Sequence, residues 1–218
     1  MRALWYDVFK QGKTLADAPP DVLAQESNMA WSTNVSGKNT RFFNIITEKD
    51  DVIAGAVVHF TDIKSYDDLL ELTGSIPWME ADFAVGRPFL YQNFVSVEKL
   101  FHQNGKYLGV EPIKRIQPFT TSPTVTWYVI LTAKTSEGFD EGHGVDNALQ
   151  AFRMLKGGIA EEVFDLLPPD DGLILRIKAN DRAEVEEYLH NFLSVRHGAV
   201  DVLVLKTKST CVWDFAFF

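Results

Sequence analysis

Residues 172–193, GLILRIKANDRAEVEEYLHNFL, decide the fold. Branched and apolar side chains in alternation predict a strand over Leu173–Lys178. Asp181 then precedes Glu184 by three residues, which is the spacing of a helix-capping box, so a helix is expected from 181 to about 193. The apolar side chains that share one face of this helix are Val185, Leu189 and Phe192.

The surrounding residues extend this strand and helix into a repeating order. In sequence these are a strand over 124–133, a helix over 146–156, strands over 160–167 and 173–178, a helix over 181–193 and a strand over 200–206. The Pro- and Gly-containing segment Pro168–Gly172 predicts the turn between the two middle strands. The order βαββαβ is that of the split βαβ, or ferredoxin-like, motif.

The first half of the chain has the same order. Its expected elements are strands over 3–9, 41–47, 52–61 and 83–90 and helices over 15–32 and 65–73. Residues 58–85 align with 177–204 without a gap, which indicates a tandem duplication. We therefore predict an α+β protein with a first ferredoxin-like half over 1–116 and a second over 117–218.

Two segments fall outside the repeat. His102–Gly105 ends in Asn-Gly, which is typical of a tight hairpin turn, so an inserted hairpin or extended arm is expected between the halves. The C-terminal tail Val212–Phe218 is strongly aromatic and is expected to pack on its own chain or on a neighbour. Both segments are suited to contacts in a homo-oligomer.

Composition excludes several classes of protein. A formal net charge of -9 removes the electrostatic basis for nucleic-acid binding and disfavours anionic membrane surfaces. Cys211 is the single cysteine, so an internal disulfide and a cysteine-based zinc site are excluded. An acidic residue follows the N-terminus before any long apolar run, and no run is long enough to span a bilayer, so we expect a cytoplasmic protein without a membrane partner.

The pattern resembles the dimeric α/β-barrel superfamily, in particular its muconolactone isomerase-like and YCII-like members. The resemblance rests on 127–132, 159–164, 172–177, 183–193 and 200–205, and in the first half on 69–78. It implies that the two halves pair sheet against sheet and form within one chain the barrel that relatives build as a dimer. It also implies a small-molecule pocket in each half. Known members include lactone isomerases, cofactor-free monooxygenases and haem-dependent enzymes.

Three side chains are candidates for catalysis. Alternation along Val52–Thr61 leaves His59 on the face away from the helices, and Arg176 has the same place on the strand 173–178. The first and third strands are neighbours in a ferredoxin-like sheet, so Asp7 is expected to approach His59 and raise its pKa, as a general base requires. Proton abstraction next to a carbonyl is the indicated reaction, with Arg176 steadying an enolate or carboxylate. Each residue also has a structural interpretation. His59 is then a hydrogen-bonded strand histidine, Asp7 an edge or capping carboxylate, and Arg176 half of a salt bridge.

These residues leave more than one function open. The first is a small-molecule enzyme of the isomerase or cofactor-free monooxygenase type, acting on an apolar carbonyl or lactone-like compound. The second is a non-catalytic protein that binds a small apolar molecule or assembles into oligomers. A haem-dependent enzyme is the third. No cofactor and no metal are expected, since there is no phosphate-binding Gly-rich loop and no histidine has the helical partner of a metal site.

Overall fold

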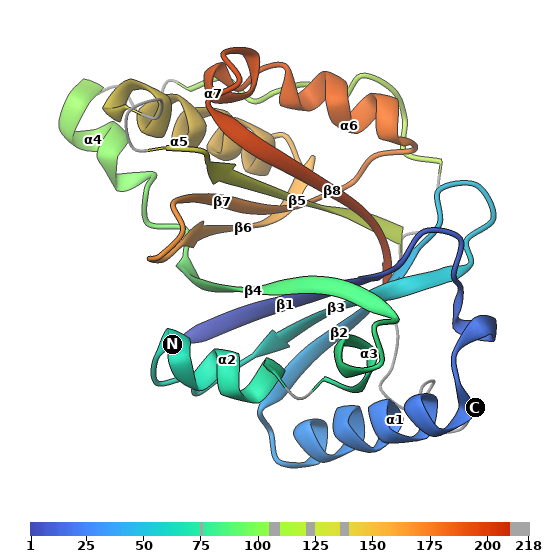
Figure 1. Ribbon diagram of the computed structural model, residues 1–218. Helices are drawn as coiled ribbons and strands as arrows, with labels where there is room; N and C mark the ends of the chain where they lie inside the picture. Colours follow the sequence, from blue (N-terminus) through green and yellow to red (C-terminus); the bar gives the residue numbers. More distant parts are fainter. Residues whose placement is uncertain (75, 105–109, 121–124, 136–139, 210–218) are drawn as a thin grey trace. The chain divides into compact units, whose positions relative to one another are not determined.

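The computed structural model describes residues 1–74, 76–104, 110–120, 125–135 and 140–209. They form an α+β fold of antiparallel strands joined by helices, as the sequence predicts (Figure 1). The chain divides into two compact units. Unit 1 contains Met1–Tyr91 and the residues from Lys206 onward, and unit 2 contains Gln92–Leu205.

Unit 1 contains the first βαββαβ segment. Its strands lie in the order β4-β1-β3-β2, so that β3 separates β1 from β2 as a split βαβ motif requires. Its helices cover one face of this sheet (Figure 1). The elements are β1 (Arg2–Phe9), the short 3-10 helix η1 (Leu15–Asp17), α1 (Pro20–Val35), β2 (Asn39–Ile46), β3 (Ile53–Phe60), α2 (Tyr66–Gly74), α3 (Pro77–Glu80) and β4 (Ala84–Asn93).

Unit 2 repeats the arrangement. Its strands lie in the order β8-β5-β7-β6, with β7 between β5 and β6. The last residues of β8 extend into unit 1, where Thr207 pairs with Ile45 of β2. The elements are α4 (Glu98–Asn104), β5 (Val125–Ala133), α5 (Glu141–Lys156), β6 (Ala160–Leu166), β7 (Gly172–Ile177), α6 (Arg182–Leu189), α7 (Leu193–Arg196) and β8 (Val200–Ser209).

Side chains at the helix ends explain where the helices begin. The carboxylate of Asp181 accepts a hydrogen bond from the backbone N–H of Glu184 at 2.9 Å, which confirms the predicted N-cap of α6. Asp140 caps α5 in the same way, accepting from the N–H of His143 at 2.9 Å. Pro20 occupies the first turn of α1, where its missing N–H costs nothing.

The core of unit 2 confirms the predicted faces of its sheet. Leu173, Leu175 and Ile177 of β7 belong to one buried apolar cluster with Met154 of α5 and Leu189 of α6. Side chains alternate along a strand, so Arg176 lies on the opposite face, away from the helices.

The predicted hairpin after β4 is wrong where the structure describes it. Residues 98–104 form α4, whose Leu100 is buried, and residues 105–109 lie outside the described part. The buried carboxylate of Asp165 accepts from the N–H groups of Val95 and Ser96, at 2.7 and 2.8 Å. These bonds hold the segment before α4 against β6, within unit 2.

Two further features complete the description. The predicted aromatic tail Val212–Phe218 lies outside the described residues. Among the helices that are described, none combines the length and the apolar character needed to cross a membrane.

Candidate functional site

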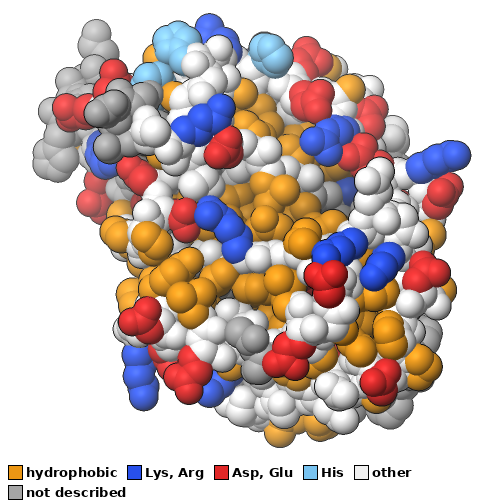
Figure 2. Space-filling view, viewed as in Figure 1, with side chains coloured by type: hydrophobic (Ala, Val, Ile, Leu, Met, Phe, Trp, Pro, Cys, Tyr) orange, Lys and Arg blue, Asp and Glu red, His pale blue; other side chains and the backbone are white. Residues whose placement is uncertain are grey.

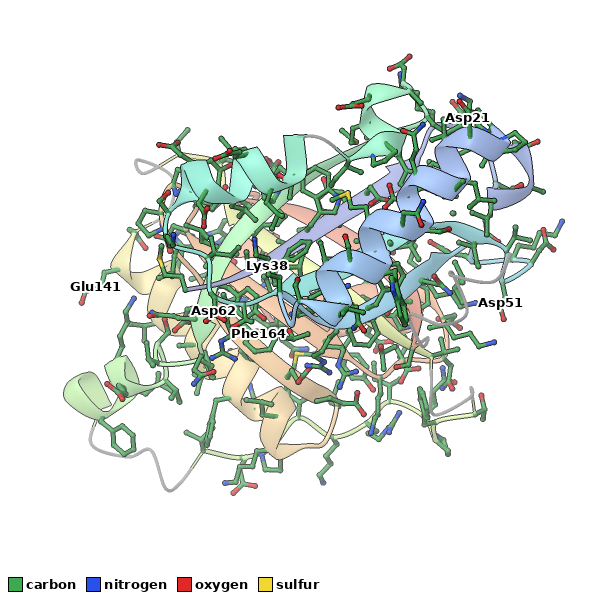
Figure 3. All side chains as sticks on the ribbon, turned by 90° about the horizontal axis from the view of Figure 1, so that it is seen from below. Asp21, Lys38, Asp51, Asp62, Glu141 and Phe164 are labelled. Carbon is green, nitrogen blue, oxygen red and sulfur yellow. The ribbon has the colours of Figure 1, made fainter. Side chains whose placement is uncertain are left out.

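A pocket in unit 1 lies between α1 and the sheet face that α1 covers. It combines two carboxyl groups and one amide with aromatic and aliphatic walls. In Figure 3, Asp21 marks the first turn of α1 and Lys38 the connection that follows this helix. The lining residues are Trp5 and Asp7 of β1, Glu26, Met29, Ala30 and Thr33 of α1, Asn39 and Phe42 of β2, Val58 and Phe60 of β3, and Ile76.

Asp7 supplies the first carboxyl group. It is 2 % exposed, and it accepts hydrogen bonds from the indole N–H of Trp5 at 3.0 Å and the backbone N–H of Ala56 at 3.2 Å. Burial raises the pKa of this carboxyl to about 7, although both hydrogen bonds favour the charged form. Asp7 is therefore divided between its acid and its carboxylate near neutral pH.

Glu26 supplies the second carboxyl group, from the buried side of α1. Burial, and to a smaller extent the nearby charge of Asp7, raise its pKa to about 8, although the hydrogen bond from the backbone N–H of Trp78 favours the charged form. Its Oε2 atom is buried and has no hydrogen-bond partner among the residues that the structure describes. The same is true of Oδ1 of Asn39. The pocket is thus lined by two residues with a buried oxygen atom that accepts no hydrogen bond from the described residues.

The pocket is small, and a wider cleft adjoins it. The pocket has a cavity volume of about 20 Å³, and the cleft has about 410 Å³. Met29 and Thr33, one helical turn apart on α1, line both spaces. The remaining residues of the cleft are Ser32, Lys38, Asp68, Glu71 and Leu72.

The predicted contact between Asp7 and His59 is wrong. In the β1–β3 register, His59 pairs with Leu4, whereas Asp7 pairs with Ala56. Paired residues share a face, so the two side chains lie on opposite faces of the sheet. His59 is on the face away from α1, as expected from alternation. There its buried Nδ1 lies 2.7 Å from the hydroxyl of Tyr91.

Arg176 lies in unit 2 and forms ion pairs with two neighbouring carboxylates. Its nitrogen atoms are 3.0 Å from Glu161 and 2.8 Å from Glu162, both on β6. Lys178 also pairs with Glu161, at 2.6 Å. Arg176 therefore forms a salt bridge between neighbouring strands of one sheet, and a catalytic role for it stays a prediction.

Sequence reasoning did not identify Glu26 or Asn39. Glu26 belongs to a stretch, Leu23–Ser27, whose polar residues resemble an exposed helical face. Its position two turns after Pro20, on the same side as Ala30 at four residues' spacing, is the signal that could have identified it.

No cluster of three or more His, Cys, Asp or Glu side chains in the described ranges is arranged to hold a metal ion. In the part of unit 2 that the structure describes, large and fully buried side chains occupy the layer between the helices and the sheet, and they leave no space beside them for a flat macrocycle. They include Trp127, Met154, Tyr188 and Phe192. This layer does not fit a haem group.

Comparison with solved structures supports the ferredoxin-like α+β fold. No protein-family model and no curated protein matches the sequence. Among solved structures, the chain is similar to chlorite dismutase from Candidatus Nitrospira defluvii in complex with imidazole, with a TM-score of 0.58 and 11% identity over 99% of this chain and 93% of that chain. A mutant of the same enzyme gives a TM-score of 0.57 at 10% identity, with the same coverage. A putative chlorite dismutase gives 0.52 at 11% identity, over 99% of this chain and 96% of that chain. At these identities the similarity concerns the fold alone.

Proposed function

We propose that the chain is a small-molecule enzyme of the isomerase or cofactor-free monooxygenase type, acting on an apolar carbonyl or lactone-like compound. The observation that carries this proposal is the pair of buried carboxyl groups, Asp7 and Glu26, with raised pKa values facing one pocket. Carboxyl groups that titrate near neutral pH inside a pocket are typical of acid–base catalysis.

The pair can perform the step that both reaction types share. With a pKa of about 7, Asp7 takes a proton from the carbon next to the carbonyl, and the C–H electron pair moves to the carbonyl oxygen as an enolate. Glu26, with a pKa of about 8, is mainly protonated at pH 7 and donates a hydrogen bond to that oxygen. In an isomerase the proton returns to another carbon, whereas in a monooxygenase the enolate reduces dioxygen.

The walls of the pocket support an apolar substrate. Trp5, Phe42 and Phe60 contribute large apolar surfaces beside the carboxyl groups. The small cavity admits the carbonyl end of the substrate, and the remainder lies in the adjoining cleft. The Asp7–Glu26 pair replaces the Asp7–His59 pair of the sequence analysis, and Asp7 keeps its role as a candidate base. Roles for His59 and Arg176 remain predictions of the sequence.

We also propose that the two units arose by duplication and pair sheet against sheet, as in muconolactone isomerase-like proteins. The repeated βαββαβ order supports the duplication. A haem-dependent reaction receives no support from the helix–sheet layer of unit 2, which is filled.

Deuterium exchange tests the proposed chemistry directly. Cyclohexanone and δ-valerolactone are incubated with the protein in D2O, and loss of the signal of the hydrogens next to the carbonyl is followed by NMR. We expect Asp7→Asn to slow the exchange by about a hundredfold or more, since it removes the base. Glu26→Gln, which retains an N–H donor, is expected to slow it less.

Glu71→Gln is the matched control, because it removes an exposed carboxylate from the neighbouring cleft. Its exchange rate is expected to equal that of the wild-type protein. If the wild-type protein binds these compounds without exchanging their hydrogens, the non-catalytic binding function replaces the enzyme.

A further inference from the structure

The pocket between α1 and the sheet contains more hydrogen-bond acceptors than donors. Oε2 of Glu26 and Oδ1 of Asn39 are buried and have no partner in the described part of the chain. The carboxylate of Asp7 lines the same space. Buried acceptors of this kind are normally paired, so the pocket is suited to a group that supplies several N–H or O–H donors.

The size of the pocket restricts that group. A cavity volume of about 20 Å³ is enough for one small head group, since one water molecule needs about 10–15 Å³ on the same scale. A primary ammonium has this size and carries three donors. The three acceptor side chains Asp7, Glu26 and Asn39 match those three donors in number.

The surroundings of the pocket also favour a cation. The faces of aromatic rings attract cations, and the rings of Trp5, Phe42 and Phe60 line the space. In the adjoining cleft, the carboxylates of Asp68 and Glu71 lie on the route along Met29 and Thr33. Lys38 is the opposing charge in that cleft, and the chain as a whole carries a net charge of -9.

We infer that this pocket binds primary ammonium compounds with a short alkyl chain, with the ammonium head between Asp7, Glu26 and Asn39 and the chain directed along α1 into the cleft. Such a compound competes with any neutral substrate for the same space. This inference goes beyond the proposed reaction, because it requires the acceptors of the pocket and not the transfer of a proton from carbon.

Binding of a cation is coupled to ionisation of the pocket. An ammonium favours the charged forms of Asp7 on β1 and Glu26 on α1, so binding releases protons from them. The affinity is therefore expected to rise as pH increases from 6 to 9. It falls when the amine itself loses its proton, which for an alkylamine such as that of lysine occurs near pH 10.4. The other charged side chains that line the adjoining cleft are Asp68, Glu71 and Lys38.

Calorimetric titration at pH 8 with three ligands of one chain length tests the inference. We expect n-butylammonium to bind at least about tenfold more tightly than n-butanol and butyltrimethylammonium, which lack respectively the charge and the N–H donors. Its binding enthalpy is expected to vary with the ionisation enthalpy of the buffer, because protons are released. Equal binding of n-butanol or of butyltrimethylammonium would overturn the inference, as would no binding of any ligand, which would leave water as the occupant.

Variants locate the site. Glu26→Gln and Asn39→Leu preserve side-chain volume, and each is expected to lower the affinity for n-butylammonium by about tenfold. Glu71→Gln in the cleft is expected to change this affinity by less than about twofold. An equal loss in Glu71→Gln and Glu26→Gln would place the cation in the cleft and contradict the inference. The ligand series uses the unaltered protein, so the test holds even if a variant fails to fold. Absence of carbonyl exchange would refute the proposed reaction and leave this measurement unaffected.

Discussion

Two glycines allow the sheet to close tightly around the Asp7 segment of β1. A Cβ atom built on Gly55 would collide with the backbone carbonyl oxygen of Asp7, and one on Gly86 would collide with that of Tyr6. Gly55 also has a φ of +151°, which L-residues rarely adopt. The position of the Asp7 carboxyl therefore depends on glycine in both neighbouring strands.

Substitution of Gly55 tests this dependence. We expect Gly55→Ala to lower the free energy of unfolding by about 3 kcal/mol, because the backbone of β1 must move to admit the methyl group. Gly37→Ala is the control, since Gly37 has a φ of +74° and no heavy atom near its would-be Cβ, and we expect about 1 kcal/mol there. Denaturant unfolding followed by circular dichroism measures both. Equal losses would show that backbone strain, and not collision, sets the cost.

At the scale of elements, a buried carboxylate joins α6 to the segment that precedes β5. Oε2 of Glu184 accepts hydrogen bonds from the backbone N–H of Asn180 at 2.7 Å and from the side-chain amide of Gln117 at 3.2 Å. Its Oε1 accepts from the hydroxyl of Tyr188 at 2.8 Å. The predicted capping box thus forms in part, with the Glu side chain reaching the residue before the cap.

We expect Glu184→Gln to destabilise the protein by about 2–3 kcal/mol, because an amide cannot accept all of these bonds and the lost ones are charge-assisted. Glu186→Gln, two residues away, removes an exposed ion pair with Arg182 and is expected to cost less than about 0.5 kcal/mol. Thermal unfolding of both variants compares the two. If Glu186→Gln proves as damaging as Glu184→Gln, the buried network does not stabilise α6.

The elements show what the sequence could and could not predict. The strands could be predicted because apolar side chains at alternate positions indicate the buried face of a strand, as Leu173, Leu175 and Ile177 do. Which residue of β3 pairs with Asp7 could not be predicted, because the register of two strands depends on the lengths of the connections. Asp7 pairs with Ala56, and a shift of one residue would change which side chains of β3 lie on its face of the sheet. The Asn-Gly pair at the end of His102–Gly105 predicts a hairpin turn, whereas residues 98–104 form α4, after a segment that Asp165 holds by hydrogen bonds.

At the scale of the whole molecule, charge and burial together determine how stability depends on pH. Figure 2 shows acidic and basic side chains interspersed over the visible face, so no extended basic surface is present on that face. Exposed groups that titrate near their ordinary pKa contribute little to the pH dependence of stability. The buried pair Asp7 and Glu26 is the exception, because both pKa values rise on folding.

We expect the free energy of unfolding to fall as pH increases from about 5 to 9. Between the ordinary pKa values of 3.8 and 4.5 and the folded values of about 7 and about 8, the folded state binds more protons than the unfolded state, so increasing pH favours unfolding. Each rise corresponds to about 4 kcal/mol, and the sum is smaller because part of the rise at Glu26 comes from the charge of Asp7. Urea unfolding at several pH values measures the slope.

The double variant Asp7→Asn with Glu26→Gln separates this effect from a general loss of stability. Replacing the carboxyls by amides disturbs the hydrogen bonds from Trp5 and Ala56 equally at every pH, so it lowers stability by a constant amount. The slope between pH 5 and 9 is nevertheless expected to become nearly flat, because the titrating groups are gone. Asp68→Asn with Glu71→Gln, which removes the two carboxylates of the cleft, should retain the wild-type slope. A wild-type slope in the Asp7–Glu26 variant would mean that this pair does not titrate in the folded protein, and it would remove the basis for both its proposed chemistry and its coupling to cation binding.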